Sequence, residues 1–235
     1  MDEWSLLIEV GGDDSGMIQV EVAKAVLPYA EYKAMQEKLR DERKELLLFC
    51  EHPPTITGGV QWKPQNLLRG EEQLREQGIP LVPIRRGGDL TAHEPGQLVI
   101  YPHVDLKQRN ISLSDFFRTL LEISSDSILQ VAGLSVETKK DYPGLYVNNR
   151  KICAIGVEAR SFFTSSGVAI NVNNDLSTFA NIVACGLSQF EADSLQQILG
   201  QPLEMDGLIA AWSGGFQAFL EGRSRSELPS GADNR

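Results

Sequence analysis

Strand-like segments crowd into residues 144–172, and their spacing constrains the fold more than any other feature of the sequence. They cover residues 144–147, 151–160 and 167–172, and Asn148-Asn149 supplies a tight turn between the first two. Connections this short join antiparallel neighbours, because parallel strands need a long crossover. The pattern therefore predicts an antiparallel sheet within an α+β fold, not a series of βαβ units.

The rest of the chain alternates between helical and strand-like patterns. Apolar residues line one side of 114–131, so this segment is the strongest helix candidate; Ser112 or Ser114 can cap its start and Gly133 its end. We also expect two strands joined by a turn within 4–23, further strands at 45–51, 79–84 and 98–101, a loop at 58–70, and helices at 29–44, 71–77, 194–199 and 208–219.

Length and composition fit an ordinary globular protein. The chain has 235 residues, of which 42% are hydrophobic, enough for a substantial core. We expect one catalytic domain over 1–222, and a tail at 223–235 whose serine, glycine and proline content predicts fraying. The apolar runs are too short to span a bilayer, and the N-terminus lacks the pattern of a secretory signal. The expected location is therefore cytoplasmic, with no membrane partner.

Charge and cysteine content exclude several classes of function. A net charge of −10 argues against general nucleic-acid binding, which needs a basic surface. The cysteines are three and irregularly spaced, which predicts reduced thiols instead of a disulfide framework. Cys50 and Cys153 lie in apolar runs and are expected to be structural. Cys50-x-His52 has no second matching pair of ligands, so we expect no metal site and no cofactor.

A glycine-rich stretch is the most informative motif for function. It reads Arg86-Gly87-Gly88, then Thr91-x-His93, then Pro95-Gly96-Gln97, and it leads into the strand at 98–101. Glycines let the backbone approach a ligand and present N–H groups, which suit a developing oxyanion. A histidine in such a loop either handles protons or pins the loop. The sequence leaves both roles of His93 open.

A cysteine and a lysine downstream suggest acyl chemistry on a thiol. Cys185 sits between Ala184 and Gly186, which leave room for an acyl group, although a lone cysteine is more often a small buried hydrophobe. Lys151 begins an apolar run, where a lysine is usually a solvated strand end. A cation beside a thiol favours the thiolate, and a lysine in an apolar pocket can exchange protons.

Over about residues 25–200, the chain resembles the lipoyl (octanoyl) transferases. The likeness rests on ordered motifs with specific spacing: Glu51-His52-Pro53-Pro54, the stretch from Arg86 to Gln97, Tyr101-Pro102 with Asp105-Leu106, Lys151-Ile152-x-Ala154-Ile155-Gly156, and Asn171-Val172-Asn173-x-Asp175-Leu176 followed by Cys185-Gly186.

The resemblance implies a fold, a reaction and partners. The fold is that of biotin and lipoate ligases, a mixed and largely antiparallel sheet flanked by helices. The reaction moves an octanoyl group from octanoyl-acyl carrier protein to a lysine of a lipoyl domain, through a cysteine thioester. The acceptors are lipoyl domains of 2-oxoacid dehydrogenases and the glycine cleavage H protein.

The resemblance also assigns site residues. It implies Cys185 as the nucleophile and Lys151 as its catalytic partner. The substrate-binding positions are Arg86, Gly87, Gly88, Asp89, Leu90, Thr91, Ala92, His93, Ala154, Ile155, Gly156, Gly167, Val168 and Ala169. The segments 154–156 and 167–169 are small or apolar, which suits an octanoyl tail, since burial of each methylene contributes about 0.8 kcal/mol.

The chain departs from the family pattern at Ala92, Glu94 and Ala184. The family usually has an aromatic, a glycine and a proline at these positions. Glu94 adds a carboxylate that would either pair with a cation or alter substrate choice. The alternatives to octanoyl transfer are an ATP-dependent lipoate or biotin ligase of the same fold, a non-catalytic protein that binds acyl chains, and a thioester hydrolase.

Overall fold

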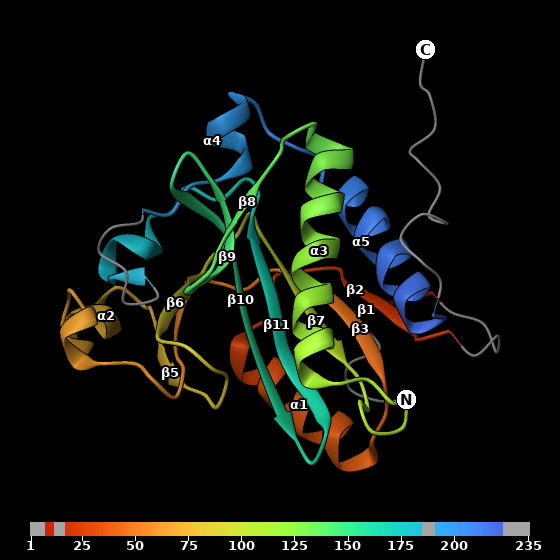
Figure 1. Ribbon diagram of the computed structural model, residues 1–235. Helices are drawn as coiled ribbons and strands as arrows, with labels where there is room; N and C mark the ends of the chain where they lie inside the picture. The colour runs from red at the N-terminus through yellow and green to blue at the C-terminus, as the bar shows by residue number, and fades with distance from the viewer. Residues whose placement is uncertain (1–7, 12–16, 185–190, 223–235) are drawn as a thin grey trace.

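An eight-stranded mixed sheet forms the centre of the computed structural model, which describes residues 8–11, 17–184 and 191–222 (Figure 1). The strand order is β1-β2-β3-β7-β11-β10-β9-β8, and only β2 and β3 pair in parallel. The strands of this sheet are β1 Ile8–Gly11, β2 Val20–Ala23, β3 Leu46–Cys50, β7 Gln97–His103, β8 Glu137–Lys139, β9 Tyr142–Val147, β10 Arg150–Arg160 and β11 Phe163–Asn171. The predicted antiparallel arrangement of 144–172 is confirmed.

A second sheet of three strands lies beside the first, in the order β5-β4-β6. Its strands are β4 Thr55–Gly58, β5 Leu81–Pro83 and β6 Leu90–His93. The sequence pattern does not predict β4 or β6, because each is only four residues long and is flanked by proline or glycine. The expected glycine loop is therefore shorter than predicted, and Thr91 and His93 belong to a strand.

Five helices, with two short 3₁₀ helices, cover the described sheets. They are α1 Tyr29–Glu42, η1 Pro64–Asn66, α2 Glu71–Glu76, α3 Leu113–Ala132, η2 Thr178–Asn181, α4 Leu195–Leu199 and α5 Met205–Leu220. The five predicted helices are confirmed. Helix α3 begins as expected, because the hydroxyl of Ser112 accepts a hydrogen bond from the amide of Asp115, and Gly133 ends it in the left-handed conformation (φ 63°).

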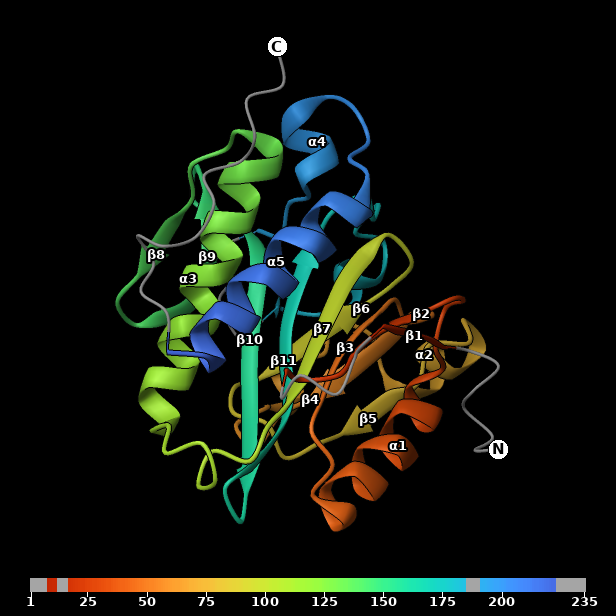
Figure 2. The ribbon, with the colours of Figure 1, turned by 90° about the vertical axis from the view of Figure 1, so that its right-hand side faces the viewer.

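The large sheet is buried on both faces, and strand β3 shows why its sequence is continuously apolar. Leu47 and Phe49 face one core cluster, which α3 and α5 cover, while Leu46 and Leu48 face another beneath α1 (Figure 2). Side chains alternate along a strand, so a strand covered on both faces needs apolar residues at every position. Packing on both faces holds the strands of the large sheet in place, and some of these strands carry residues of the site described below.

Only part of the predictions for the two ends of the chain can be compared with the structure. Strands β1 and β2 pair as expected, but their connection at 12–16 and the tail at 223–235 lie outside the described residues. No helix in the described ranges has both the length and the apolar character to cross a membrane.

Candidate active site

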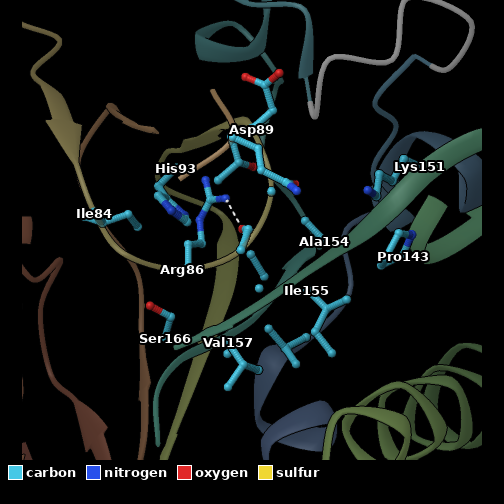
Figure 3. Close-up of a pocket in the computed structure, with 18 of the residues that line it drawn as sticks. Ile84, Arg86, Asp89, His93, Pro143, Lys151, Ala154, Ile155, Val157 and Ser166 are labelled. Carbon is cyan, nitrogen blue, oxygen red and sulfur yellow. Dashed lines mark hydrogen bonds between the residues drawn. The ribbon is translucent and has the colours of Figure 1, made fainter. Parts of the chain in front are cut away.

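A cavity of about 940 Å³ opens beside strand β10, at the point where β10 stops pairing with β9 (Figure 3). Strand β9 pairs with β10 only as far as Leu145 and Cys153. Beyond that point the turn that precedes β6 approaches the same edge, and the Gly87 amide contacts the Val157 carbonyl at 3.5 Å. The gap left between the two sheets is the cavity.

Most of the predicted site residues line this cavity. The lining includes Arg86, Gly87, Gly88, Asp89, Thr91, His93, Lys151, Ala154, Ile155, Gly156, Gly167, Val168 and Ala169. Leu90 and Ala92 instead have buried side chains in a third core cluster, with Ile56. Strand alternation explains the difference, because Thr91 and His93 point to the opposite face of β6. Any contact of Leu90 or Ala92 with substrate would have to be through the backbone.

Sequence reasoning missed several lining residues that come from distant elements. They include Tyr29 at the start of α1, Ile84 after β5, Val99 and Tyr101 on β7, and Ser166 on β11. Only Tyr101 carried a signal, since it belongs to a family motif. The others are ordinary apolar or small residues, and their position in the site depends on how the two sheets pack.

Arg86 is the main cation at the turn. Its guanidinium donates to the Thr57 carbonyl at 3.0 Å, to the Thr57 hydroxyl at 3.1 Å and to the Gly87 carbonyl at 3.0 Å. Its aliphatic stem crosses β10 at Gly156, where a Cβ atom would lie 2.7 Å from Arg86 Cδ. Gly156 therefore leaves the space that Arg86 occupies.

Asp89 fastens the turn to the segment between β4 and α2. Its carboxylate accepts hydrogen bonds from the Leu90 amide at 2.7 Å and from the Asn66 side-chain amide. Asn66 also lines the cavity. Asp89 is thus engaged within the protein, which favours a structural role in shaping the rim.

His93 is a fixed, neutral wall of the cavity. Its side chain is 6% exposed, and its Nδ1 lies 2.8 Å from Gln97 Oε1 while its Nε2 lies 3.5 Å from the Thr57 hydroxyl. Because the Gln97 oxygen only accepts, Nδ1 carries the hydrogen. Burial, with help from His52 and Arg86, lowers the pKa of His93 to about 3. The geometry favours the positioning role over proton transfer.

A chain of side-chain hydrogen bonds leads from His93 toward Lys151. The Gln97 amide donates to Asn171 Oδ1 at 2.9 Å, and the Asn171 amide donates to the Asp193 carbonyl at 2.9 Å. The Asp193 amide in turn donates to the Lys151 carbonyl at 3.0 Å. The cavity wall and the first residues of β10 are therefore held in one polar network.

Lys151 lies at the cavity rim, where a bulge interrupts β10 between Lys151 and Cys153. Its ammonium lies 5.6 Å from the centre of the Tyr146 ring, within the range of a cation–π contact. The side chain passes directly over Gly144, where a Cβ atom would overlap Lys151 Cε. Figure 3 shows the Lys151 nitrogen turned toward the side of the cavity that Ala154 lines.

The residues predicted to line an acyl channel lie on the paired segments of β10 and β11 that border the cavity. Ala154, Gly156 and Ala169 offer little side-chain volume, and Gly167 packs against β7, where a Cβ atom would lie 2.7 Å from Pro102 Cδ. Small residues keep the space open, while Val99 adds an apolar surface. The channel can take a saturated chain of medium length.

Cys185 and Gly186 lie outside the described residues, but the chain on either side is anchored at the cavity. Before them, the Val183 amide donates to the Asn66 carbonyl at 2.7 Å. After them, the Lys151 amide donates to the Glu191 carbonyl at 2.8 Å. Asn66 and Lys151 both line the cavity, so both described ends attach to its wall.

The other cysteines are buried, as predicted. Burial raises the pKa of the Cys50 thiol, with a further contribution from Glu51, and raises the pKa of Cys153 to about 12, against a lowering effect of Lys151. Both thiols are poor nucleophiles at neutral pH. Among the residues that the structure describes, no group of three histidine, cysteine or carboxylate side chains is placed to hold a metal ion.

Comparison with known proteins identifies the family of this chain. Residues 28–217 match the lipoyl protein ligase A/B catalytic domain. An octanoyltransferase of Leptospira borgpetersenii is 50% identical over 175 residues, covering 73% of this chain and 80% of that protein. An octanoyltransferase of Leptospira interrogans is 46% identical over 201 residues, covering 83% of this chain and 93% of that protein.

Solved structures show the same fold at low sequence identity. Lipoate-protein ligase A bound with ATP superposes with a TM-score of 0.65 at 17% identity, covering 86% of this chain and 85% of that one. A bi-partite lipoate protein ligase of Thermoplasma acidophilum gives a TM-score of 0.61 at 15% identity, covering 87% and 84% of the two chains. From the match over residues 28–217 and the identity to the two Leptospira proteins, the chain belongs to the lipoyl protein ligase A/B catalytic domain family.

Proposed function

We propose that this protein is an octanoyltransferase that carries the octanoyl group on Cys185 between donor and acceptor. The observation that carries the proposal is the cavity with Lys151 at its rim. The chain is hydrogen-bonded to residues that line this cavity both before and after Cys185. The identity of 46–50% to curated octanoyltransferases over most of the chain supports the reaction class.

The first half of the reaction is a thioester exchange. The Cys185 sulfur attacks the carbonyl carbon of octanoyl-acyl carrier protein, the new C–S bond forms, and the bond to the carrier sulfur breaks. An ordinary thiol, with a pKa of roughly 8.5, is only a few per cent ionised at neutral pH. The Lys151 amine takes the thiol proton, and the resulting ammonium favours the thiolate. Lys151 then passes that proton to the departing carrier thiolate, which leaves its amine neutral for the second half.

The second half transfers the group to an amine. A lysine of a lipoyl domain attacks the Cys185 thioester, an amide forms, and the Cys185 thiolate is released. Lys151 takes the proton that the attacking amine loses and returns it to the sulfur. His93 is unsuited to this work, because its pKa of about 3 and its contacts with Gln97 and Thr57 leave it neutral and engaged.

We assign oxyanion stabilisation to backbone amides of the glycine turn that lines the cavity. The Gly87 amide already contacts the Val157 carbonyl, although at a long 3.5 Å. Gly88 has a positive φ of 88° that glycine adopts without strain, and it lines the cavity. We therefore place Gly88 ahead of Gly87 as the donor to the developing oxyanion.

The proposed partners follow from this chemistry. The donor is octanoyl-acyl carrier protein, and the acceptors are lipoyl domains of 2-oxoacid dehydrogenases and the glycine cleavage H protein. A nucleophilic thiol requires a reducing compartment, so the proposal places the protein in the cytoplasm. The proposal requires no nucleic acid, membrane, metal or cofactor.

A transfer assay without nucleotide tests the proposal. Purified protein is mixed with octanoyl-acyl carrier protein and an apo lipoyl domain, and the acceptor is weighed by intact-mass spectrometry. We expect one octanoyl group on the acceptor, no dependence on ATP or magnesium, and no transfer by Cys185→Ala. Dependence on ATP would indicate a ligase, and release of free octanoate alone would indicate a hydrolase. No transfer by the parent, with acyl-chain binding unchanged in Cys185→Ser, would indicate a binding protein.

A further inference from the structure

Glu94 is a buried carboxylate that accepts hydrogen bonds from amides, whereas the sequence left open a cation partner or an effect on substrate choice. It is 2% exposed and lies immediately after β6. One oxygen accepts from the Asn174 side chain at 2.9 Å and from the Leu176 amide at 2.7 Å, and the other accepts from the Thr178 amide at 2.8 Å. An ionised carboxylate with such donors makes strong, directional hydrogen bonds.

These donors lie on the turn that leads to Cys185. Leu176 has a φ of 67°, in the left-handed region that a leucine rarely adopts, and its amide points at Glu94. Thr178 begins η2, after which the Ile182 amide bonds to the Phe179 carbonyl. Fixing this turn therefore fixes the course of the chain as far as the last residues described before Cys185.

The same carboxylate is linked to the chain beyond Cys185. The Asn174 side-chain amide, which donates to Glu94, also lies 3.3 Å from Asn171 Oδ1. The Asn171 side-chain amide donates to the Asp193 carbonyl, and the Asp193 amide donates to the Lys151 carbonyl. One network of buried hydrogen bonds thus joins Glu94, the two flanks of 185–190, and the backbone of Lys151.

We propose that Glu94 is a positioning residue for thioester formation: its carboxylate holds the chain on both sides of Cys185 in register with Lys151. The inference rests on the proposed function, since it needs Cys185 to be the nucleophile. Glu94 is not among the residues that line the described cavity, so its effect is on placement rather than on substrate contact.

Two substitutions, which weaken the Glu94 hydrogen bonds to different extents, test this role. Glu94→Gln keeps the length and one acceptor oxygen but sets an amide N–H against the Thr178 amide, whereas Glu94→Ala removes every acceptor. The rate of octanoyl transfer from carrier to Cys185 is measured in single turnover, across a range of carrier concentrations. We expect the maximal rate to fall about tenfold for Gln and about a hundredfold for Ala, because small misplacements at a reacting centre have effects of this size. The concentration at half-maximal rate should stay within about twofold, since the two variants leave the cavity lining unchanged.

A second readout separates positioning from general loosening. The rate of Cys185 alkylation by iodoacetamide, located by peptide mapping, is followed against pH. If Glu94 holds the sulfur near the Lys151 ammonium, the alkylation profile of both variants moves to higher pH. The matched control is Glu51→Gln, because the Glu51 carboxylate accepts from the Gly96 amide on the same turn at 2.5 Å, whereas the donors on 174–178 bond to Glu94. We expect this control to keep the profile and transfer rate of the parent.

Each outcome decides the question. Parent-like acylation and alkylation in folded Glu94→Gln would overturn the inference, as would equal losses in Glu51→Gln. If Glu94→Ala does not fold, the Gln variant carries the test. If the parent protein itself forms no octanoyl-Cys185, the proposed function fails and the role of Glu94 fails with it; if the parent does form it, only the inference is at stake.

Discussion

The backbone of Lys151 is joined to Glu191 by a 2.8 Å hydrogen bond, which connects the start of β10 to the chain just beyond Cys185. The next bond along, from the Asp193 amide to the Lys151 carbonyl, makes the contact a short parallel bridge around Ala192. The position of Lys151 is therefore coupled through the backbone to the described chain that follows Cys185.

Removing the Lys151 amine should abolish most transfer without unfolding the protein. We expect Lys151→Met to lower kcat by about 10²–10⁴-fold, the usual contribution of a general acid–base group, with an unchanged circular dichroism spectrum. The matched control is Lys139→Met, because Lys139 also contacts the Tyr146 ring, at 5.2 Å, but does not line the cavity. Equal activity in the two variants would exclude a catalytic role for Lys151.

Gly156→Ala should impair activity by displacing Arg86. A Cβ atom at this position would lie 2.7 Å from Arg86 Cδ, so the guanidinium would have to leave its Thr57 contacts. We expect kcat/KM for octanoyl-acyl carrier protein to fall about tenfold or more. Gly70→Ala is the control, since no atom lies within 4 Å of the added methyl group. A fully active Gly156→Ala variant would show that the position of Arg86 is not critical.

Narrowing the channel should change the preferred chain length. Ala154→Leu adds volume beside the turn that carries Arg86, within the slot assigned to the acyl tail. We expect transfer from octanoyl-carrier to fall more than transfer from hexanoyl-carrier, by about tenfold in the ratio of kcat/KM, since each buried methylene contributes about 0.8 kcal/mol. An unchanged ratio would show that the tail lies elsewhere.

Stability should fall as pH drops below about 6.5, the pKa of a histidine in an unfolded chain. Burial lowers the pKa of His52 to about 4, of His93 to about 3 and of His103 to about 4. Below pH 6.5 these histidines bind protons in the unfolded chain but stay neutral in the folded chain. Each histidine should therefore reduce the free energy of unfolding by about 2 kcal/mol between pH 7 and pH 5.

Urea unfolding at several pH values measures this effect. His103→Phe should remove about one proton from the uptake and flatten the dependence, because this residue packs beside Phe163 with ring centres 6.3 Å apart and does not line the cavity. A stability that is constant from pH 7 to pH 5 would mean that these histidines are not held neutral.

The sequence predicted the elements with strong local patterns, and it missed those that depend on tertiary packing. The long helix α3 and the antiparallel strands β9, β10 and β11 have clear periodicity or tight turns. Strands β4 and β6 do not, because each is four residues long and gains its stability from pairing with the other. Short segments of this kind carry little local signal.

The site was predictable where it rests on a motif and unpredictable where it rests on packing. Arg86 and Lys151 were assigned from motifs, and both line the cavity. Strand alternation sends the Ala92 side chain into the core, but the glycine-rich pattern around β6 predicts a loop and so gives no sign of this alternation. The amide partners of Glu94 lie 80–84 positions away along the chain, so no local pattern indicates them.

The most direct test of the account is the mass of the enzyme after exposure to the donor alone. The protein is incubated with octanoyl-acyl carrier protein without acceptor, quenched in acid, digested and mapped. We expect one octanoyl group, bound as a thioester to Cys185 and lost on adding an apo lipoyl domain. An octanoyl group on a different residue, or an unmodified enzyme that still completes transfer, would contradict it.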